Sequence, residues 1–338
     1  MAEKDFILQV KDLKTQFKVG KRMVHAVNGV SFNLERGKTL CVVGESGCGK
    51  SVTAHSVLQL LPSNGRISGG SVEYYPENGE CMTLSTYKKN GKKMRSVRGK
   101  DISMIFQDPM STLNPVYTVG DQIMEMLVAH EKVSKAEGKA RIIKLLADLG
   151  IPEPEIRYDQ YPHEFSGGMK QRVMIAIAMI CNPAILIADE PTTALDVTIQ
   201  AQILDLIRKM QKEFGTSVIL ITHNMGIVAE IADDVAVMYM GRVVEYGTLE
   251  QVFTKPSHPY TKALMRSVPV LGMDKNRELD TIEGSTPDAS TVFTGCEFAD
   301  RCDFATEACS KRFPVDTVIE EGHTVRCLLF EEGEDNGK

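Results

Sequence analysis

The pattern of apolar and polar positions in this 338-residue chain predicts an α/β fold. Apolar residues alternate with polar ones within residues 6–34, which predicts short strands such as Val24–Val27 and Val30–Leu34. Later runs are almost wholly apolar and predict buried strands, and the last two have the pattern of a parallel sheet covered on both faces. These runs are Thr39–Val43, Ile102–Phe106, Ile185–Ala188 and Val218–Ile221.

Longer stretches with helical signals lie between these strands. Ser134 is followed three residues later by Glu137, which has the form of a capping box, and Gly150 marks the end of the helix that follows. The segment from about 108 to 180 is expected to be an inserted helical subdomain. Helices are predicted over residues 51–61, 134–149, 169–181 and about 197–214.

Composition and charge narrow the class of protein. Hydrophobic residues make up 43% and charged residues 25% of the chain, as in ordinary globular proteins. The net charge of −6 gives no sign of a nucleic-acid-binding protein, which is usually basic. No secretory signal is expected, because two acids precede any apolar run. The longest apolar run, Val173–Cys181, is far shorter than the roughly 18 residues of a membrane helix, so a soluble or peripheral protein is expected.

A change of composition near Lys255-Pro256 divides the chain. A typical size of roughly 150 residues per domain predicts about two domains. We expect a first domain over residues 1–255 and a small C-terminal extension over 256–338, which holds four cysteines. The basic, polar run at 88–100 is expected to be a solvated loop.

Eight residues after the strand at 39–43 have the pattern of a phosphate-binding loop. Backbone N–H groups of such a loop turn inward around phosphates, and the helix that follows presents its positive end. Lys50 is expected to reach the β- and γ-phosphates, and the Ser51 hydroxyl to bind Mg²⁺. Val52, at the start of the helix, belongs to the same predicted site, and the alternative is a plain glycine turn. The loop reads Gly44-Glu45-Ser46-Gly47-Cys48-Gly49-Lys50-Ser51.

Asp189 and Glu190 close the apolar strand at 185–188. An acid at the carboxyl end of a parallel strand points into the ligand crevice of the sheet. Asp189 is expected to hold Mg²⁺, directly or through water. Glu190 is placed to orient and deprotonate an attacking water. The alternative is a pair of surface acids that open a turn.

His223 and Gln107 each follow the end of another buried strand. For His223 we expect contact with the γ-phosphate or the attacking water, the alternative being a structural or merely exposed histidine. The neutral amide of Gln107 can bind Mg²⁺ or water and still move with its loop.

A serine and two glycines, Ser166-Gly167-Gly168, open the helix that starts at Met169. The serine caps the helix and the glycines expose N–H groups at its positive end, which makes a second anion site. Because the chain's own phosphate loop already has a full set of ligands, this site is expected to bind the γ-phosphate on a second subunit. Asp196 would then lie along the dimer seam, or would only cap the next helix.

These motifs, in this order, resemble those of the nucleotide-binding subunit of ATP-binding cassette (ABC) transporters, over about residues 6–255. The resemblance implies a P-loop NTPase core with a mixed sheet, an N-terminal antiparallel β subdomain and the helical insertion. It also implies ATP with Mg²⁺, adenine stacked on Phe17, coupling of Gln107 to membrane subunits, and a signature loop at residues 166–169. The commonest family signature is Leu-Ser-Gly-Gly-Gln; here Phe165 and Met169 occupy the flanking positions.

Two further segments are similar to the oligopeptide/dipeptide importer subfamily, namely Phe106–Pro115 and His258–Thr261. This resemblance implies peptide import, a second ATPase subunit of the F type, two transmembrane permease subunits and, indirectly, an extracellular or periplasmic solute-binding protein. It places the chain on the cytoplasmic face of the membrane. An importer of nickel or another solute, a soluble ABC ATPase outside transport, and a regulatory nucleotide sensor stay open as alternatives.

Four of the eight cysteines lie near the C-terminus. Their spacings of five, six and seventeen residues differ from the two-residue gaps of zinc ribbons and ferredoxins. Four thiols within 32 residues still favour a soft metal. The subfamily resemblance, through Gly295–Phe298 and Arg301-Cys302, implies a [4Fe-4S] cluster, and Zn²⁺ or unligated or disulfide-bonded cysteines stay open. The four are Cys296, Cys302, Cys309 and Cys327.

Overall fold

A computed structural model describes residues 5–77, 79–108, 112–193, 195–267 and 282–331. The chain divides into two compact units, and both contain strands and helices. Unit 1 comprises residues 1–7, 34–38 and 74–220, and unit 2 comprises 8–33, 39–73 and 221–338. The α/β class predicted from the sequence is confirmed, whereas the domain boundary at 255 stays a prediction. Residues 109–111 of the importer-like segment, and Ala194 in the segment before Asp196, lie outside the described residues.

Unit 2 holds most of an N-terminal antiparallel sheet, in the order β2-β1-β4. Strand β1 spans Phe6–Val19, β2 spans Arg22–Glu35 and β4 spans Gly65–Tyr74. The prediction of several short strands within residues 6–34 was wrong in length. Strand β2 continues through Asn28 because the backbone N–H of this residue donates to the carbonyl of Gly241 at 2.7 Å, which holds it extended.

The second sheet of unit 2 has the order β11-β12-β10-β9-β3. The buried strand β3 (Thr39–Val43) pairs in parallel with β9 (Asp234–Tyr239), and β10 (Arg242–Thr248) pairs antiparallel with β9. Strands β12 (His323–Val325) and β11 (Thr317–Glu320) continue the sheet beyond β10, so the C-terminal residues add two strands to it. The helices of unit 2 are α1 (Lys50–Val57), α9 (Met225–Ile231), α10 (Leu249–Thr254), α11 (Pro259–Arg266) and α12 (Glu307–Lys311).

Unit 1 contains parallel strands and a group of helices. Strands β6 (Ile102–Ile105) and β7 (Ile185–Asp189) pair in parallel, and every residue in both is buried. Next to β7 comes β8 (Ser217–Thr222), the strand at which the chain passes into unit 2. Helix α8 (Val197–Phe214) spans the residues that the sequence predicted.

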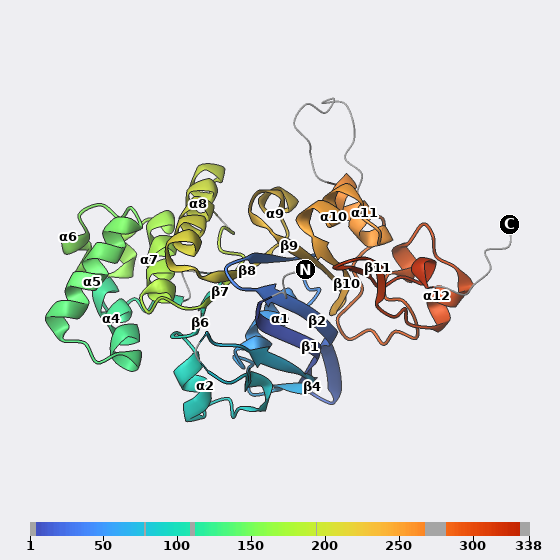
Figure 1. The fold of residues 1–338 in the computed structure, drawn as a ribbon, viewed down its shortest axis with the longest axis horizontal. Helices are drawn as coiled ribbons and strands as arrows, with labels where there is room; N and C mark the ends of the chain where they lie inside the picture. Colours follow the sequence, from blue (N-terminus) through green and yellow to red (C-terminus); the bar gives the residue numbers. More distant parts are fainter. Residues whose placement is uncertain (1–4, 78, 109–111, 194, 268–281, 332–338) are drawn as a thin grey trace. The chain divides into compact units, whose positions relative to one another are not determined.

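Four helices contact one another and form the predicted helical insertion (Figure 1). Three of them begin at a side-chain cap, since Thr118 accepts from the N–H of Asp121, Ser134 from that of Glu137 and Ser166 from that of Met169. These helices are α4 (Val119–His130), α5 (Lys135–Asp148), α6 (Pro154–Tyr158) and α7 (Gly167–Met179). Across the described ranges, no helix is both long and apolar enough to cross a bilayer.

The prediction that the basic run at residues 88–100 is a solvated loop was wrong. This run contains helix α2 (Lys92–Val97), on which Met94 and Val97 are buried while the lysines remain at the surface. Two apolar side chains three residues apart lie on one face of a helical turn, so burial of this pair outweighs the polar character of the run.

Candidate functional site

The predicted phosphate loop lies between β3 and α1 in unit 2, and its backbone requires glycine. Gly49 is the N-cap of α1 with a φ of 101°, and a Cβ there would lie 2.4 Å from the carbonyl oxygen of Ala26. Gly44 has a φ of 150°, and its Cβ would lie 2.1 Å from the carbonyl oxygen of Met238. Both positions exclude a side chain, because real Cβ atoms do not approach oxygen so closely. The sequence after β3 is therefore shaped as a loop at a helix N-terminus.

Lys50 is folded over this loop. Its side chain is buried, and Nζ donates to the carbonyl oxygens of Gly44 at 2.7 Å and Glu45 at 2.9 Å. The Cys48 thiol beside it is also buried, and burial raises its pKa despite the opposing effect of the Lys50 ammonium. A neutral, enclosed thiol is unreactive, so Cys48 contributes to the loop as a small residue.

Gln107 and Glu190, predicted from separate motifs, meet in unit 1. The amide Nε2 of Gln107 donates to Oε2 of Glu190 at 2.9 Å, and the hydroxyl of Thr193 donates to the same oxygen at 2.9 Å. Glu190 has a φ of 45°, a left-handed conformation that costs a non-glycine residue about 1–3 kcal/mol and concentrates at functional sites. Asp189, the last residue of β7, is buried. The end of β7 therefore presents an oriented carboxylate beside a second, buried one.

His223 and Phe17 both belong to unit 2. His223 is exposed just after β8, between Thr222 and Asn224, whose N–H donates to the Thr222 hydroxyl at 3.0 Å. Phe17 is half-buried on β1, and a Cβ on Gly65 would lie only 2.6 Å from its ring. The ring is thus fixed by a close backbone neighbour while part of it remains accessible.

Residues 166–169, the predicted signature loop, begin α7 as expected. The Ser166 hydroxyl accepts from the N–H of Met169 at 3.3 Å, and both Ser166 and Gly167 are exposed. Gly168 lies against the side chain of Ile199, so that a Cβ on Gly168 would be only 3.1 Å from it. Asp196 caps α8 by accepting from the N–H of Ile199 at 3.0 Å. The first turn of α7 therefore offers N–H groups to an external anion.

The four C-terminal cysteines all lie in unit 2 and are reduced. The pKa of Cys296 is raised to about 12 and that of Cys327 to about 11, chiefly by burial and in part by the charges of neighbouring cysteines. The backbone N–H of Cys296 donates to the carbonyl of Cys309 at 2.7 Å. Even so, no set of three or more metal-ligating side chains in the described ranges is arranged to hold a metal ion. The donor chemistry suits a soft metal, but the side chains as placed do not form its site.

A buried carboxylate that the sequence did not single out joins three segments of unit 2. Glu245, on β10, accepts from the N–H groups of Ser257 at 2.8 Å and His258 at 2.9 Å. Its Oε1 also lies 2.8 Å from Nε2 of His323 on β12, and Glu245 and His323 are both buried. No local motif marks this group, since its members lie up to 78 positions apart.

Because the side chain of His258 is buried, we predict that the folded protein loses stability in acid. His258 is fully buried at the start of α11, where Nδ1 accepts from the N–H of Tyr260 at 3.0 Å. Its pKa is lowered to about 3, mainly by burial and in part by the charge of Lys262, while a hydrogen bond with the backbone of Arg326 acts in the opposite direction. Because the folded pKa lies below the unfolded value, the unfolded chain alone takes up a proton as the pH falls from about 6.5 towards 3.

Between pH 7.5 and 5.0 this histidine should therefore remove about 2 kcal/mol from the free energy of unfolding. Urea unfolding followed by circular dichroism measures the change, and His258→Asn, which retains a cap acceptor, should show a loss smaller by that amount. An equal loss in wild type and variant would refute the assignment.

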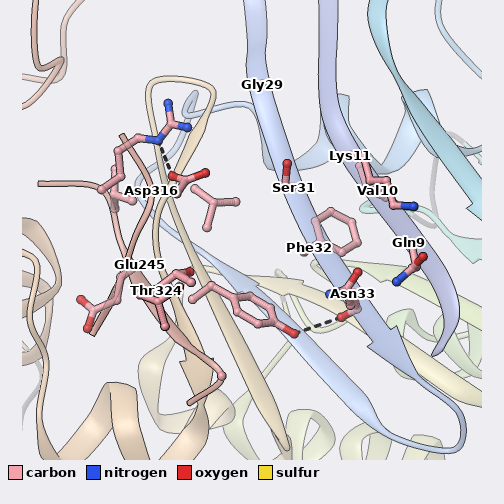
Figure 2. A pocket seen from close by; sticks show the side chains of 16 residues that line it. Gln9, Val10, Lys11, Gly29, Ser31, Phe32, Asn33, Glu245, Asp316 and Thr324 are labelled. Carbon is pink, nitrogen blue, oxygen red and sulfur yellow. Dashed lines mark hydrogen bonds and ion pairs between the residues drawn. The ribbon is translucent and has the colours of Figure 1, made fainter. Parts of the chain in front are cut away.

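A cavity of about 520 Å³ in unit 2 lies apart from these motifs (Figure 2). Side chains of β1, β2 and β10 line it together with Asp316 and Thr324, and Tyr246 donates to the carbonyl of Asn33 across it. None of its lining residues belongs to the phosphate loop or to the predicted residues around it, so it has no part in the candidate site.

Two family models match the sequence. The model described as "ABC transporter" matches residues 27–193, and that described as "Oligopeptide/dipeptide transporter, C-terminal region" matches residues 244–309. The second match includes three of the four C-terminal cysteines and ends at Cys309.

Similar proteins match over nearly the whole chain. The dipeptide transport ATP-binding protein DppD of Bacillus subtilis (strain 168) is 49% identical over 324 residues, 96% of this chain and 94% of the relative. The oligopeptide transport ATP-binding protein OppD of the same organism is 48% identical over 96% of this chain and 89% of its own.

Solved structures of cassettes are similar in fold. A dimeric ATP-binding cassette in a post-hydrolysis state, bound to ADP and phosphate, has a TM-score of 0.62 at 25% identity and covers 72% of this chain and 98% of its own. The cbiO1 subunit from Clostridium perfringens, part of the ABC transporter complex cbiONQ, has a TM-score of 0.61 at 30% identity. The match covers 74% of this chain and 92% of cbiO1.

Proposed function

Because this chain belongs to the ABC transporter family and is an ATPase coupled to transport, we propose that it powers the import of peptides. The observation that carries the proposal is the carboxylate of Glu190, held by Gln107 and Thr193 at the end of β7. The peptide solute is taken from the names of the relatives, which are dipeptide and oligopeptide transport proteins.

In the proposed site, the phosphate loop binds the triphosphate of ATP. The loop N–H groups and the start of α1 surround the phosphates, and the Lys50 ammonium neutralises their charge. The half-exposed ring of Phe17 stacks on adenine. The residues proposed to contact this nucleotide are Phe17, Gly44, Ser46, Gly47, Cys48, Gly49, Lys50, Ser51, Val52, Gln107 and Asp189.

Oxygen donors of three side chains would hold Mg²⁺. They are the Ser51 hydroxyl, the Asp189 carboxylate and the Gln107 amide, and hard oxygen ligands of this kind suit the ion. When bound, Mg²⁺ would neutralise charge that develops on the β- and γ-phosphates.

Hydrolysis in this proposal depends on Glu190. Its carboxylate orients the attacking water and accepts a proton from it, while His223 contacts the water or the γ-phosphate. The leaving diphosphate is stabilised by Lys50 and the loop N–H groups. The hydrogen bond from Gln107 to Glu190 lets a movement of the Gln107 loop change the position of the base, which would couple hydrolysis to permease subunits.

The signature loop acts on the nucleotide of a second ATPase subunit. Ser166, Gly167, Gly168 and Met169 form the positive end of α7, where Ser166 and Gly167 are exposed and the N–H of Met169 donates to the Ser166 hydroxyl. Asp196 would lie along the same seam. The dimeric cassette among the similar structures, bound to ADP and phosphate, supports this arrangement. We take the partner to be a different, F-type chain, and two permease subunits and a solute-binding protein to complete the importer.

The location and the metal content belong to the same proposal. The chain would lie on the cytoplasmic face of the membrane, with residues 1–255 as the nucleotide-binding domain and 256–338 as the extension. The four C-terminal thiols would hold a [4Fe-4S] cluster, with Zn²⁺ as the alternative, after rearrangement of their side chains. Iron and sulfide analysis of anaerobically prepared protein tests this part alone.

Copurification tests the proposed assembly. A tagged chain extracted from membranes should carry with it two polytopic membrane proteins and a second ATPase chain. Recovery with ribosomes or DNA, or recovery of the tagged chain alone from intact membranes, would contradict the assignment to an importer.

A further inference from the structure

The second residue of the phosphate loop is bound by the C-terminal segment. Arg301, in the short helix η3 (Ala299–Arg301), donates from Nη1 to Oε2 of Glu45 at 2.7 Å and from Nη2 to Oε1 at 3.0 Å. The hydroxyl of Thr286 donates to the same carboxylate at 3.2 Å. The Arg301 side chain is only 5% exposed and that of Glu45 24% exposed, so this bidentate pair is shielded from water. Such pairs combine charge with a fixed geometry.

Aromatic side chains hold Arg301 in place. Its guanidinium lies 5.8 Å from the ring centre of Tyr239 and 5.9 Å from that of Phe298, and Nη1 also lies 3.3 Å from the Tyr239 hydroxyl. The backbone carbonyl of Glu283 accepts from Nε at 2.9 Å. Three residues therefore fix the side chain, which loses little further freedom when it binds the loop.

The loop backbone has a second support from the same cluster. The N–H of Glu45 donates to the hydroxyl of Tyr260 at 2.9 Å, and the Tyr260 ring is buried 4.7 Å from that of Tyr239. Glu45 is thus held at both its side chain and its backbone by residues that follow β9.

A carboxylate within a phosphate-binding loop would repel a triphosphate unless its charge were neutralised. Burial is the main cause of the raised pKa of the Cys48 thiol, and the Glu45 charge adds to it, so this charge acts within the loop. We propose that Arg301 is a positioning residue for ATP binding, which neutralises Glu45 and holds the phosphate loop in its binding shape. The proposal rests on the assignment of residues 44–51 as the ATP phosphate site. Folding of the C-terminal extension is then required for full ATP affinity.

A charge-rescue experiment tests this role. Arg301→Met leaves the negative charge of Glu45 uncompensated. We expect the variant to bind trinitrophenyl-ATP about tenfold more weakly, because one unpaired charge within about 10 Å of the phosphates has an effect of this size on affinity. Adding Glu45→Gln to that variant removes the charge and should restore affinity to within about threefold of wild type. A purely structural contribution of Arg301 predicts no rescue, because the double variant still lacks the ion pair.

Three variants act as controls. Arg326→Met removes another partly buried arginine of the extension, which pairs with Asp316 at 2.7 Å, and should leave the affinity unchanged. Thr286→Val removes a hydrogen bond from an uncharged hydroxyl to Glu45 but leaves the charge of the carboxylate paired with Arg301, and should change the affinity less than twofold. Lys50→Met should abolish binding, and if it does not, the assignment of the phosphate loop itself fails.

Circular dichroism of each variant establishes that it is folded. If folded Arg301→Met binds the nucleotide as tightly as wild type, or if its loss of affinity persists in the double variant, the proposal for Arg301 is wrong. An equal loss in Arg326→Met would also overturn it, since general weakening of the extension would then explain the result.

Discussion

Glu190→Gln should reduce ATP hydrolysis by about 10²–10³-fold and leave ATP binding close to that of wild type. Glutamine keeps the shape of the side chain and can accept the hydrogen bonds from Gln107 and Thr193, but it cannot take the proton of an attacking water. The nucleotide should therefore bind without being turned over, and the dimer with the partner ATPase should persist in its closed form. Phosphate release and analytical size-exclusion chromatography with ATP measure the two effects.

Thr193→Val is the matched control for this prediction. It removes one hydrogen bond to the Glu190 carboxylate and keeps the base, so hydrolysis should fall by less than about tenfold. Near-normal turnover of Glu190→Gln, in a complex where this is the active site, would show that another group is the base.

Glu245→Ala should lower the free energy of unfolding by about 3 kcal/mol. The substitution leaves the N–H groups of Ser257 and His258 and the imidazole of His323 without their buried acceptor. Because His323 is on β12, the segment after residue 256 should also become more sensitive to protease. The chain has no tryptophan, so urea unfolding is best followed by circular dichroism.

The control for this prediction is Glu131→Gln. Glu131 pairs with Arg141 at 2.5 Å, but both side chains are about one-third exposed, and water compensates for the loss of such a pair. A change below about 1 kcal/mol is expected. Equal destabilisation by the two substitutions would mean that Glu245 does not organise the C-terminal strands.

The sequence was informative wherever a short segment determines its own structure. The buried strand at 39–43, the helix at 197–214 and the caps at Ser134 and Ser166 follow from neighbouring residues, and the structure contains all of them. The phosphate loop was also recognisable locally, because its residues are consecutive between β3 and α1, although the backbone oxygens that exclude a side chain at Gly44 and Gly49 belong to the distant Met238 and Ala26.

Long-range pairs could not be predicted in this way. Arg301 and Glu45 are 256 positions apart, and the local pattern that marks Arg301-Cys302 gives no sign that this arginine pairs with the phosphate loop. Strand β2 was predicted too short because its continuity at Asn28 depends on a hydrogen bond to the distant Gly241. Four cysteines within 32 residues favoured a soft metal, but thiol placement depends on folding of the whole extension.

Peptide uptake by the reconstituted complex tests the central claim most directly. Vesicles that contain this chain, its ATPase partner, the permease subunits and the solute-binding protein should accumulate a labelled dipeptide when ATP is supplied on the side of the ATPase subunits. With Glu190→Gln in place of the wild-type chain, uptake should stop although ATP still binds. ATP hydrolysis that drives accumulation of nickel or another solute, but not of any peptide, would contradict the account.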